Sequence, residues 1–181
     1  MRFIQRQLEE FYAPFCALRH EIRAKGELRV RVSKAAAAEW AASFEGVESP
    51  EQKQEIEAHH KGQFESIVTS NNKQLADEHI PDYRKMLDLF REKLWLVERS
   101  TRIHYPTLVE FVEIWNRRGA DSLPASVAER IGHGEETLDS LEEDAERHRD
   151  QLQRELKAGG STRWSAHKSS MRKPLRKETQ P

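Results

Sequence analysis

Two adjacent histidines, His59 and His60, come nearest to a metal-binding pattern in this sequence. Glu57 stands three residues before His60, which fits one half of the Glu-x-x-His motif that helical bundles use to hold two iron ions. That chemistry needs a second such motif and two further glutamates, because four carboxylates must neutralise and bridge the metals. No second Glu-x-x-His occurs, and a chain with 31 acidic residues and 8 histidines contains a half motif by chance. We therefore expect no bound metal.

The sequence also lacks the usual signs of nucleophilic or phosphate chemistry. Cys16 is the single cysteine, and it lies beside the apolar face of an expected helix, where a small thiol normally packs. No G-x-S-x-G elbow, P-loop or G-x-G-x-x-G is present, and only one pair of the eight glycines is adjacent. We predict no catalytic residue, no cofactor and a non-enzymatic protein.

The stretch 94–115 is the most distinctive candidate for a binding pocket. It holds two tryptophans and a tyrosine around a loop with four charged or titratable residues: Glu98, Arg99, Arg102 and His104. One interpretation is an aromatic-walled polar pocket. The other, which we favour, is a helical hairpin whose tryptophans close the end of a bundle while Arg and Glu cap helix ends.

Helices must position these residues. The first, over 4–22, has apolar residues spaced 4, 3, 4, 3, 4 as in a coiled-coil seam: Ile4, Leu8, Phe11, Phe15, Leu18 and Ile22. Pro14 lies beside this seam, so either the helix kinks there or a second helix begins at Ala13–Pro14; we favour the kink because the seam keeps its phase. Residues 27–45 follow as a helix bent at Gly26, because the strand-like stretch 26–33 has no partner strand.

Ser49, Pro50 and Gln52 predict a capping box and the start of a third helix that ends near His79. Its expected inward positions are Ile56, His60, Phe64, Ile67, Asn71 and Leu75. Pro81 starts a helix over 82–97 that repeats the seam spacing with Tyr83, Leu87, Phe90, Leu94 and Val97. This helix is apolar over a wide arc, so we expect it to be the most buried and to pack against the 4–22 seam.

Three shorter patterns complete the expected elements. Residues 107–118 form a helix with Leu108, Phe111, Val112 and Trp115 on one face, and Gly119 stops it. A short helix lies within 123–134. A final amphipathic helix begins near residue 135 and ends at Gly159–Gly160.

Composition and charge favour an elongated all-α bundle of four or more helices with a disordered basic C-terminal tail. Of the 181 residues, 36% are hydrophobic and 34% charged, which is typical of helices with narrow apolar stripes. Residues 159–181 hold six basic residues and one acidic residue, a net +5. Because the whole chain carries −1, residues 1–158 carry −6. We predict a bundle domain over 1–158 and a disordered tail over 159–181.

Two stretches bear a resemblance to a known group. The stretch 7–23, QLEEFYAPFCALRHEIR, resembles the opening of a loose group of uncharacterised bacterial proteins, and 90–115 is similar to a later block of that group. Many members have one transmembrane helix just before the first block. Here only residues 1–6 precede it, so we expect either that the anchor is lost or that translation starts further upstream. The resemblance implies membrane association, and it identifies no catalytic residue that could be transferred to this chain.

These observations predict a non-enzymatic helical interaction or scaffold protein, with an unknown protein partner or a second copy. The alternative is a soluble variant or fragment of a membrane-tethered helical protein whose basic tail contacts anionic lipid. No specific nucleic-acid partner is predicted. With one cysteine and no signal peptide or membrane span, we expect a cytoplasmic location or one at the inner face of the membrane.

Overall fold

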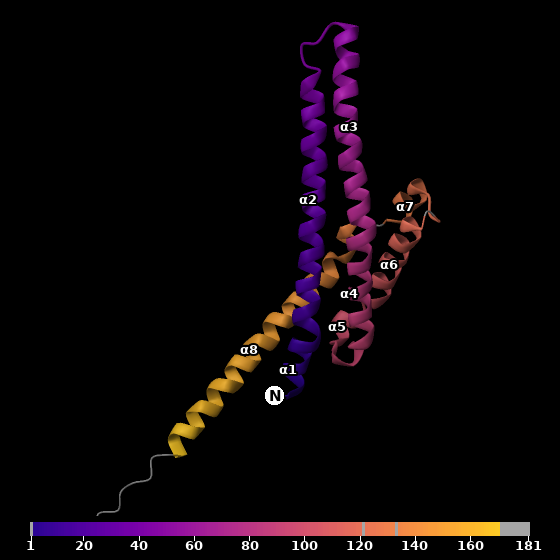
Figure 1. Cartoon of the computed structure of the whole chain (residues 1–181). Helices are drawn as coiled ribbons and strands as arrows, with labels where there is room; N and C mark the ends of the chain where they lie inside the picture. Colours follow the sequence, from indigo (N-terminus) through magenta and orange to yellow (C-terminus); the bar gives the residue numbers. More distant parts are fainter. Residues whose placement is uncertain (1, 121, 133, 171–181) are drawn as a thin grey trace, which may run out of the picture.

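The computed structural model of the chain is all-α. It describes residues 2–120, 122–132 and 134–170, with the side chains of 125, 129 and 159–170 left out, and no strand occurs among these residues. In chain order the elements are α1 (Arg2–Gln7), η1 (Leu8–Tyr12), α2 (Ala13–Ser43), α3 (Pro50–Gln74), η2 (Leu75–His79), α4 (Ile80–Glu92), η3 (Leu94–Leu96), α5 (Arg99–Arg102), α6 (Tyr105–Gly119), α7 (Ala125–Ile131), η4 (Glu135–Leu138) and α8 (Asp139–Ser170). The all-α prediction is confirmed (Figure 1).

Two prolines are accommodated by π-helical turns. Pro14 and Pro81 are each the second residue of an α-helix, and each follows a five-residue π turn, η1 or η2. A proline inside an α-helix has no N–H and clashes with the carbonyl four residues earlier. In η1 the Ala13 N–H instead bonds the Leu8 carbonyl, and in η2 the Ile80 N–H bonds the Leu75 carbonyl. The wider turn keeps the chain helical through both prolines.

Of two predicted helix boundaries, the one at Pro81 is confirmed and the one at Gly26 is wrong. We expected a third helix to end near His79 and a new one to start at Pro81; α4 begins at Ile80, although the π turn η2 joins it to α3 without a break. We also expected a bend at Gly26 between two helical stretches. Instead α2 runs unbroken from Ala13 to Ser43, because a single glycine in a helix costs only about 1 kcal/mol relative to alanine.

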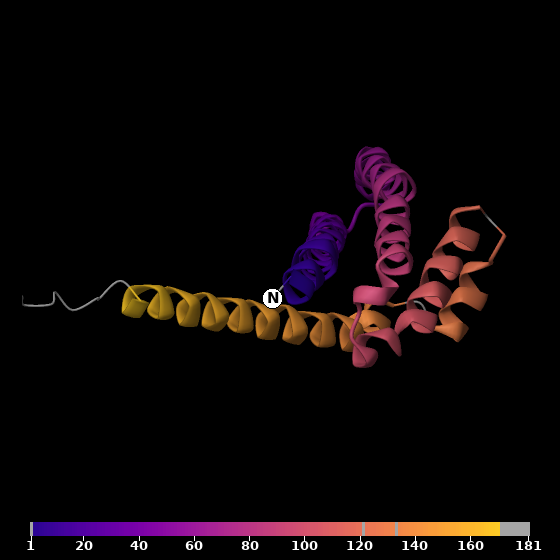
Figure 2. The ribbon, with the colours of Figure 1, turned by 90° about the horizontal axis from the view of Figure 1, so that it is seen from below.

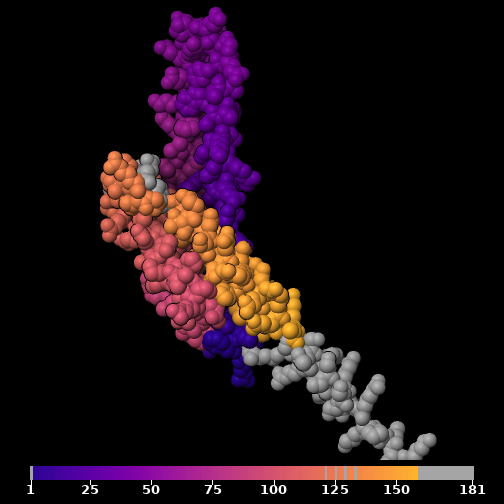
Figure 3. All heavy atoms as spheres, turned by 180° about the vertical axis from the view of Figure 1, so that it is seen from behind, coloured from indigo at the N-terminus to yellow at the C-terminus, as the bar shows by residue number. Residues whose placement is uncertain are grey.

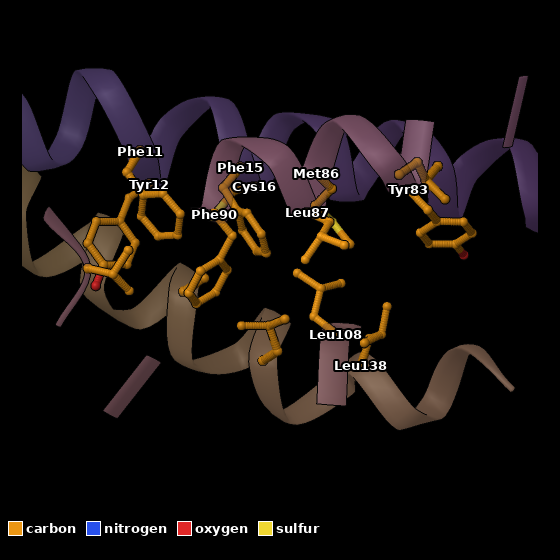
Figure 4. Close-up of a cluster of buried hydrophobic side chains, with 14 of the residues drawn as sticks. Phe11, Tyr12, Phe15, Cys16, Tyr83, Met86, Leu87, Phe90, Leu108 and Leu138 are labelled. Carbon is orange, nitrogen blue, oxygen red and sulfur yellow. The ribbon is translucent and has the colours of Figure 1, made fainter. Parts of the chain in front are cut away.

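The core lies where α1, η1 and the first turns of α2 meet α4, α6 and α8. The predicted first seam packs against α4: the ring centroids of Phe11 and Phe15 lie 5.3 and 5.8 Å from that of Phe90. Figure 4 shows these rings with Tyr12, Met86 and Leu108 between the helices. On the other side of the core, α6 contributes Phe111 and α8 contributes Leu141. These positions confirm the apolar faces that the sequence predicts.

Above the core, α2 and α3 form an antiparallel hairpin that projects away from the other helices (Figures 1 and 3). Its seam holds Trp40 against Phe64, with ring centroids 5.2 Å apart, and Asn71 donates a hydrogen bond to Ser33. The predicted inward face of α3 is the half-buried face of this seam. Gly46, at φ +76°, sits in the turn between the two helices, where a left-handed backbone favours glycine.

Helix α8 lies obliquely across α2 and extends beyond the bundle (Figures 2 and 3). We expected this helix to end at Gly159–Gly160, but it continues to Ser170. The domain boundary at residue 158 and the disorder of 159–181 stay predictions, and residues 171–181 lie outside the described part of the chain.

Two local expectations are also corrected. The helix predicted over 82–97 ends at Glu92 and gives way to the short η3, so Leu94 and Trp95 turn outward while Leu96 and Val97 stay buried. Ser49 precedes α3 as predicted, but its hydroxyl bonds the Glu51 carboxylate and makes no capping hydrogen bond to the backbone. Among the described residues, no helix is both long and apolar enough to span a lipid bilayer.

The position of Phe90 gives the first prediction. Its ring is fully buried between Phe11, Phe15 and Tyr105, so Phe90→Ala should lower the free energy of unfolding by about 3–5 kcal/mol. Val109→Ala, at a partly exposed position on α6, is the control and should cost less than about 1 kcal/mol. Urea denaturation measures both, and equal midpoints for the Phe90 variant and the parent would contradict the packing.

Candidate functional site

The polar centre of the molecule is Arg19, which lies at the foot of the hairpin, where α2 leaves the core. Its side chain is 1% exposed, although arginine is almost never fully buried without partners. It forms ion pairs with Glu135 on η4 and, at 3.1 Å, with Glu142 on α8. Tyr83 on α4 donates a hydrogen bond to the same Glu135 carboxylate. The Arg19 guanidinium and the Glu135 carboxylate thus join α2, α4, η4 and α8.

A row of ion pairs continues this network along the contact between α2 and α8. Arg23 contacts Glu142 at 3.1 Å, Glu27 at 3.3 Å and Asp139 at 3.7 Å. The pKa of the Arg23 guanidinium is raised, chiefly by the charge of Glu142. On the other side of Glu142, His20 approaches the Glu146 carboxylate at 2.6 Å. Ion pairs therefore line the contact between the two helices beside the apolar core.

His20, Glu142 and Glu146 form a group whose ligand atoms lie within 4.8 Å of one another, close enough to surround a metal ion. However, Glu142 already accepts contacts from the guanidinium groups of Arg19 and Arg23. Two neighbouring positive charges repel a divalent cation, and they already neutralise the buried carboxylate. We interpret the group as part of the ion-pair network.

The metal candidates of the sequence lie far from this network, on α3. Glu57 is exposed, His60 is half-buried, and the rings of His59 and His60 lie 5.3 Å apart beside a cavity near the hairpin turn. Among the described residues, no further histidine, cysteine or carboxylate gathers around Glu57 and His60. The half motif therefore has no partners within the described part of the chain.

Cys16 is buried in the core cluster, 3% exposed. Burial raises the pKa of its thiol to about 11, mainly because a thiolate would lose its hydration there. Since the thiolate is the reactive form, Cys16 is a packing residue at neutral pH.

The predicted pocket of 94–115 is not assembled as an aromatic-walled cavity. Trp95 lies at the end of the bundle beside Phe3, with Arg6 over its ring at 4.5 Å. Trp115 lines a different cavity, near Leu75 on η2. Between them, the loop residues make structural contacts: Arg102 donates to the Val97 carbonyl, and the Glu98 carboxylate accepts from the Gln7 amide.

A serine, a histidine and an aspartate meet near this loop, a combination that sequence reasoning missed. The Ser100 hydroxyl lies 2.8 Å from Nε2 of His148, and Asp144 lies 3.7 Å from the same nitrogen. In a catalytic triad the acid binds the nitrogen opposite the serine, so that it orients the base. Here serine and aspartate share one nitrogen, and Ser100 itself donates to Asp144. This geometry does not activate a nucleophile.

Asp144 instead ends a hydrogen-bond chain that ties the loop to the core. The Glu98 N–H donates to the Tyr12 hydroxyl at 2.9 Å, and Thr101 donates to Asp144 at 2.6 Å. The Tyr12 and Thr101 hydroxyls are 3.2 Å apart, so with these two bonds Tyr12 is the donor. Burial raises the pKa of Tyr12 and keeps it protonated for this role. We interpret the chain as structural.

A cavity of about 620 Å³ opens above the Arg19 network, between α2 and η4. One wall is the α2 stretch from Arg23 to Arg31, which includes Gly26, Arg29 and Val30. The facing wall is acidic and consists of Glu135, Glu136 and Asp139. This foot cavity is the concave, charged site that the described structure places beside its most buried ion pair.

The sequence carries one signal for Arg19 and none for its partners. Arg19 lies four residues after Phe15 and three before Ile22, so helical periodicity places it on the buried face. Its ion pair with Glu135 joins residues 116 positions apart, and no local pattern marks such a pair. His79 and Arg29 were missed for the same reason.

Removal of the two carboxylates should lower the free energy of unfolding more than removal of the arginine. The double variant Glu135→Gln/Glu142→Gln leaves a buried guanidinium without a counter-ion and should cost about 3 kcal/mol or more of unfolding free energy. Arg19→Met should cost less, because Glu135 keeps Tyr83 and Glu142 keeps Arg23.

Glu113→Gln provides the control for this comparison. Glu113 forms an exposed pair with Arg117 on α6, which is worth at most about 1 kcal/mol. Urea denaturation of the four proteins measures the differences. A double variant that is no less stable than Glu113→Gln would show that the buried network does not hold the helices together.

Comparisons with protein-family models, with curated proteins and with solved structures give no match to this chain. The resemblance of residues 7–23 and 90–115 to a group of bacterial helical proteins therefore stays a prediction.

Proposed function

We propose that this chain is a non-enzymatic helical interaction or scaffold protein that binds a protein partner through the α2–α3 hairpin. The observation that carries the proposal is the burial profile: from residue 23 to residue 78 no side chain is fully buried, although this stretch contains two long helices. Helices in water depend on packing for most of their stability. A projecting hairpin whose two helices bury no side chain fully between them is typical of a surface that another helix can cover.

Apolar side chains are available on the hairpin for such a contact. Leu28 is 53% exposed, and Val30, Val32 and Val68 are exposed as well. Val30 and Val68 lie together beside a shallow groove between α2 and α3, while Leu28 and Val32 stand one turn apart on α2. The spacing of Leu28 and Val32 is that of the residues through which one helix contacts another.

The polar networks of the core support a non-enzymatic role. Cys16 is buried and held as a thiol, Ser100 and His148 lack triad geometry, and Arg19 is engaged with carboxylates. In each case the group stabilises the fold through the contacts it makes. A single cysteine suits the reducing cytoplasm in which we place the protein.

Site-specific photo-crosslinking in the native cell tests this proposal. A photoreactive phenylalanine at Leu28 or Val68 should give discrete adducts, whose mass distinguishes a second copy of the chain from another protein. Val32→Glu should abolish the Leu28 adduct without loss of stability, since Val32 is exposed. The same probe at Glu110, an exposed position on α6, is the control. Equal labelling from Glu110 and from the hairpin would contradict the proposal.

A second candidate function is attachment to an anionic membrane, and it rests on the end of the bundle that holds α1. Phe3, Trp95 and Ile103 are 51%, 50% and 67% exposed there, and Arg6 lies over the Trp95 ring. α1 and α5 lie at this same end in Figure 1. Aromatic rings with neighbouring arginines suit the interface between water and lipid headgroups. The basic residues of 159–181 would add electrostatic attraction.

Vesicle flotation tests this second candidate. The full chain should float with anionic vesicles at low salt and not with neutral vesicles, and Phe3→Ala/Trp95→Ala should reduce binding severalfold. A 1–158 truncation measures the contribution of the basic residues separately. Leu28→Ala/Val68→Ala, which changes only the hairpin, is the control. If the Phe3/Trp95 variant and the truncation both float like the parent, neither surface binds lipid.

A further inference from the structure

We propose that the foot cavity binds a small oxyanion, a carboxylate or phosphate group, through Arg29. The foot cavity adjoins the hairpin groove beside Val68, but this inference does not depend on the partner proposed for the hairpin. The cavity, of about 620 Å³, falls within the size range of small-molecule sites. Its charged groups decide what it would bind.

Arg29 is a half-buried cation of this cavity that forms no ion pair with a described residue. It lines both the foot cavity and the adjoining groove beside Val68. Among the described residues, no carboxylate lies within 4.0 Å of its guanidinium and none accepts a hydrogen bond from it. Burial lowers its pKa, and the nearby charge of Arg118 lowers it further, while Glu135 acts in the opposite direction. A partly desolvated cation without a partner is costly unless an anion arrives.

Two arginines near Arg29 are paired with carboxylates, and Arg31, which also lines the cavity, is exposed. Arg19 has two carboxylate partners and Arg23 has three. Guanidinium groups bind carboxylate and phosphate in a bidentate manner, so an oxyanion is the ligand that matches Arg29. The contrast between the paired and the unpaired arginines marks the position of the ligand.

The acidic wall of the cavity does not prevent this binding. Glu27 and Asp139 face Arg23, and the Glu135 carboxylate is held by Arg19 and Tyr83. The two guanidinium groups of Arg19 and Arg23 thus offset about half of the negative charge of these three carboxylates and Glu142. Glu136 is exposed, and water screens its charge.

A second unsatisfied group lies close to the same cavity. His79 on η2 is 2% exposed, and its Nε2 has no hydrogen-bond partner among the described residues. The neighbouring ring atom Cε1 lies 4.0 Å from the point where a Cβ at residue 26 would stand. Gly26 lines the cavity, so no side chain at that position covers the edge of the imidazole. Buried polar groups normally have hydrogen-bond partners, and a bound ligand would supply the partner that the His79 Nε2 lacks.

Thermal unfolding in the presence of sodium phosphate and of sodium succinate, each against sodium chloride at equal ionic strength, tests the inference. A saturable increase in melting temperature with phosphate alone identifies a phosphate group, and one with succinate alone identifies a carboxylate. Arg29→Gln should abolish the increase, with affinity weakened about tenfold or more. Without added anion, Arg29→Gln should be at least as stable as the parent, because it removes an unpaired charge.

Lys34→Gln is the matched control. Lys34 is an exposed cation on the same helix, so this variant changes the net charge equally and should keep the response. Amide chemical shifts of the unaltered chain give an independent readout: Gly26 and Glu136 should shift saturably, and Gly62 on α3 should not. The absence of a saturable response to either anion, or an equal loss of response in Lys34→Gln, would overturn the inference.

Discussion

The buried charge of Arg19 is the constraint on which the arrangement of the helices depends. A guanidinium stays protonated at any pH at which proteins fold, so its burial requires carboxylates close by. Glu135 and Glu142 supply them, and they come from the segment that starts α8. Because Tyr83 shares Glu135, α4 is tied to the same point. The position of α8 across α2 and the acidic wall of the foot cavity both follow from this ion pair.

The Arg19 network also lies at the boundary between the closed core and the two-helix hairpin. Below it, the aromatic rings of α2 and α4 pack into a closed core, with Ile22 as the last buried residue of α2. Above it, the same helices continue as a two-helix hairpin without a fully buried side chain. The π turn η2 lets one helical path run from α3 into α4 despite Pro81. The hairpin is therefore an extension of core helices, which suits a projecting binding surface.

Sequence periodicity predicted the faces of the helices well and their ends less well. The seam from Ile4 to Ile22 and its contact with Phe90 follow from apolar spacing, because burial of one helix face requires that spacing. The continuity of the helical path through Pro81 could not be predicted from apolar spacing, since a π turn changes the hydrogen-bond register without any change in composition. The outward turn of Trp95 depends on the early end of α4, which periodicity does not mark.

The candidate site escaped prediction for a different reason. Arg29, Glu135 and His79 belong to three separate segments, and each has an ordinary polar neighbourhood in the sequence. What distinguishes them is a spatial contrast: within one short stretch of α2, Arg19 and Arg23 are paired and Arg29 is not. In a folded protein nearly all buried polar groups have hydrogen-bond partners, and the exceptions lie mainly at sites where a bound ligand supplies the missing partner. The unpaired guanidinium beside an orphan imidazole is such a departure, and it lies where the hairpin joins the core.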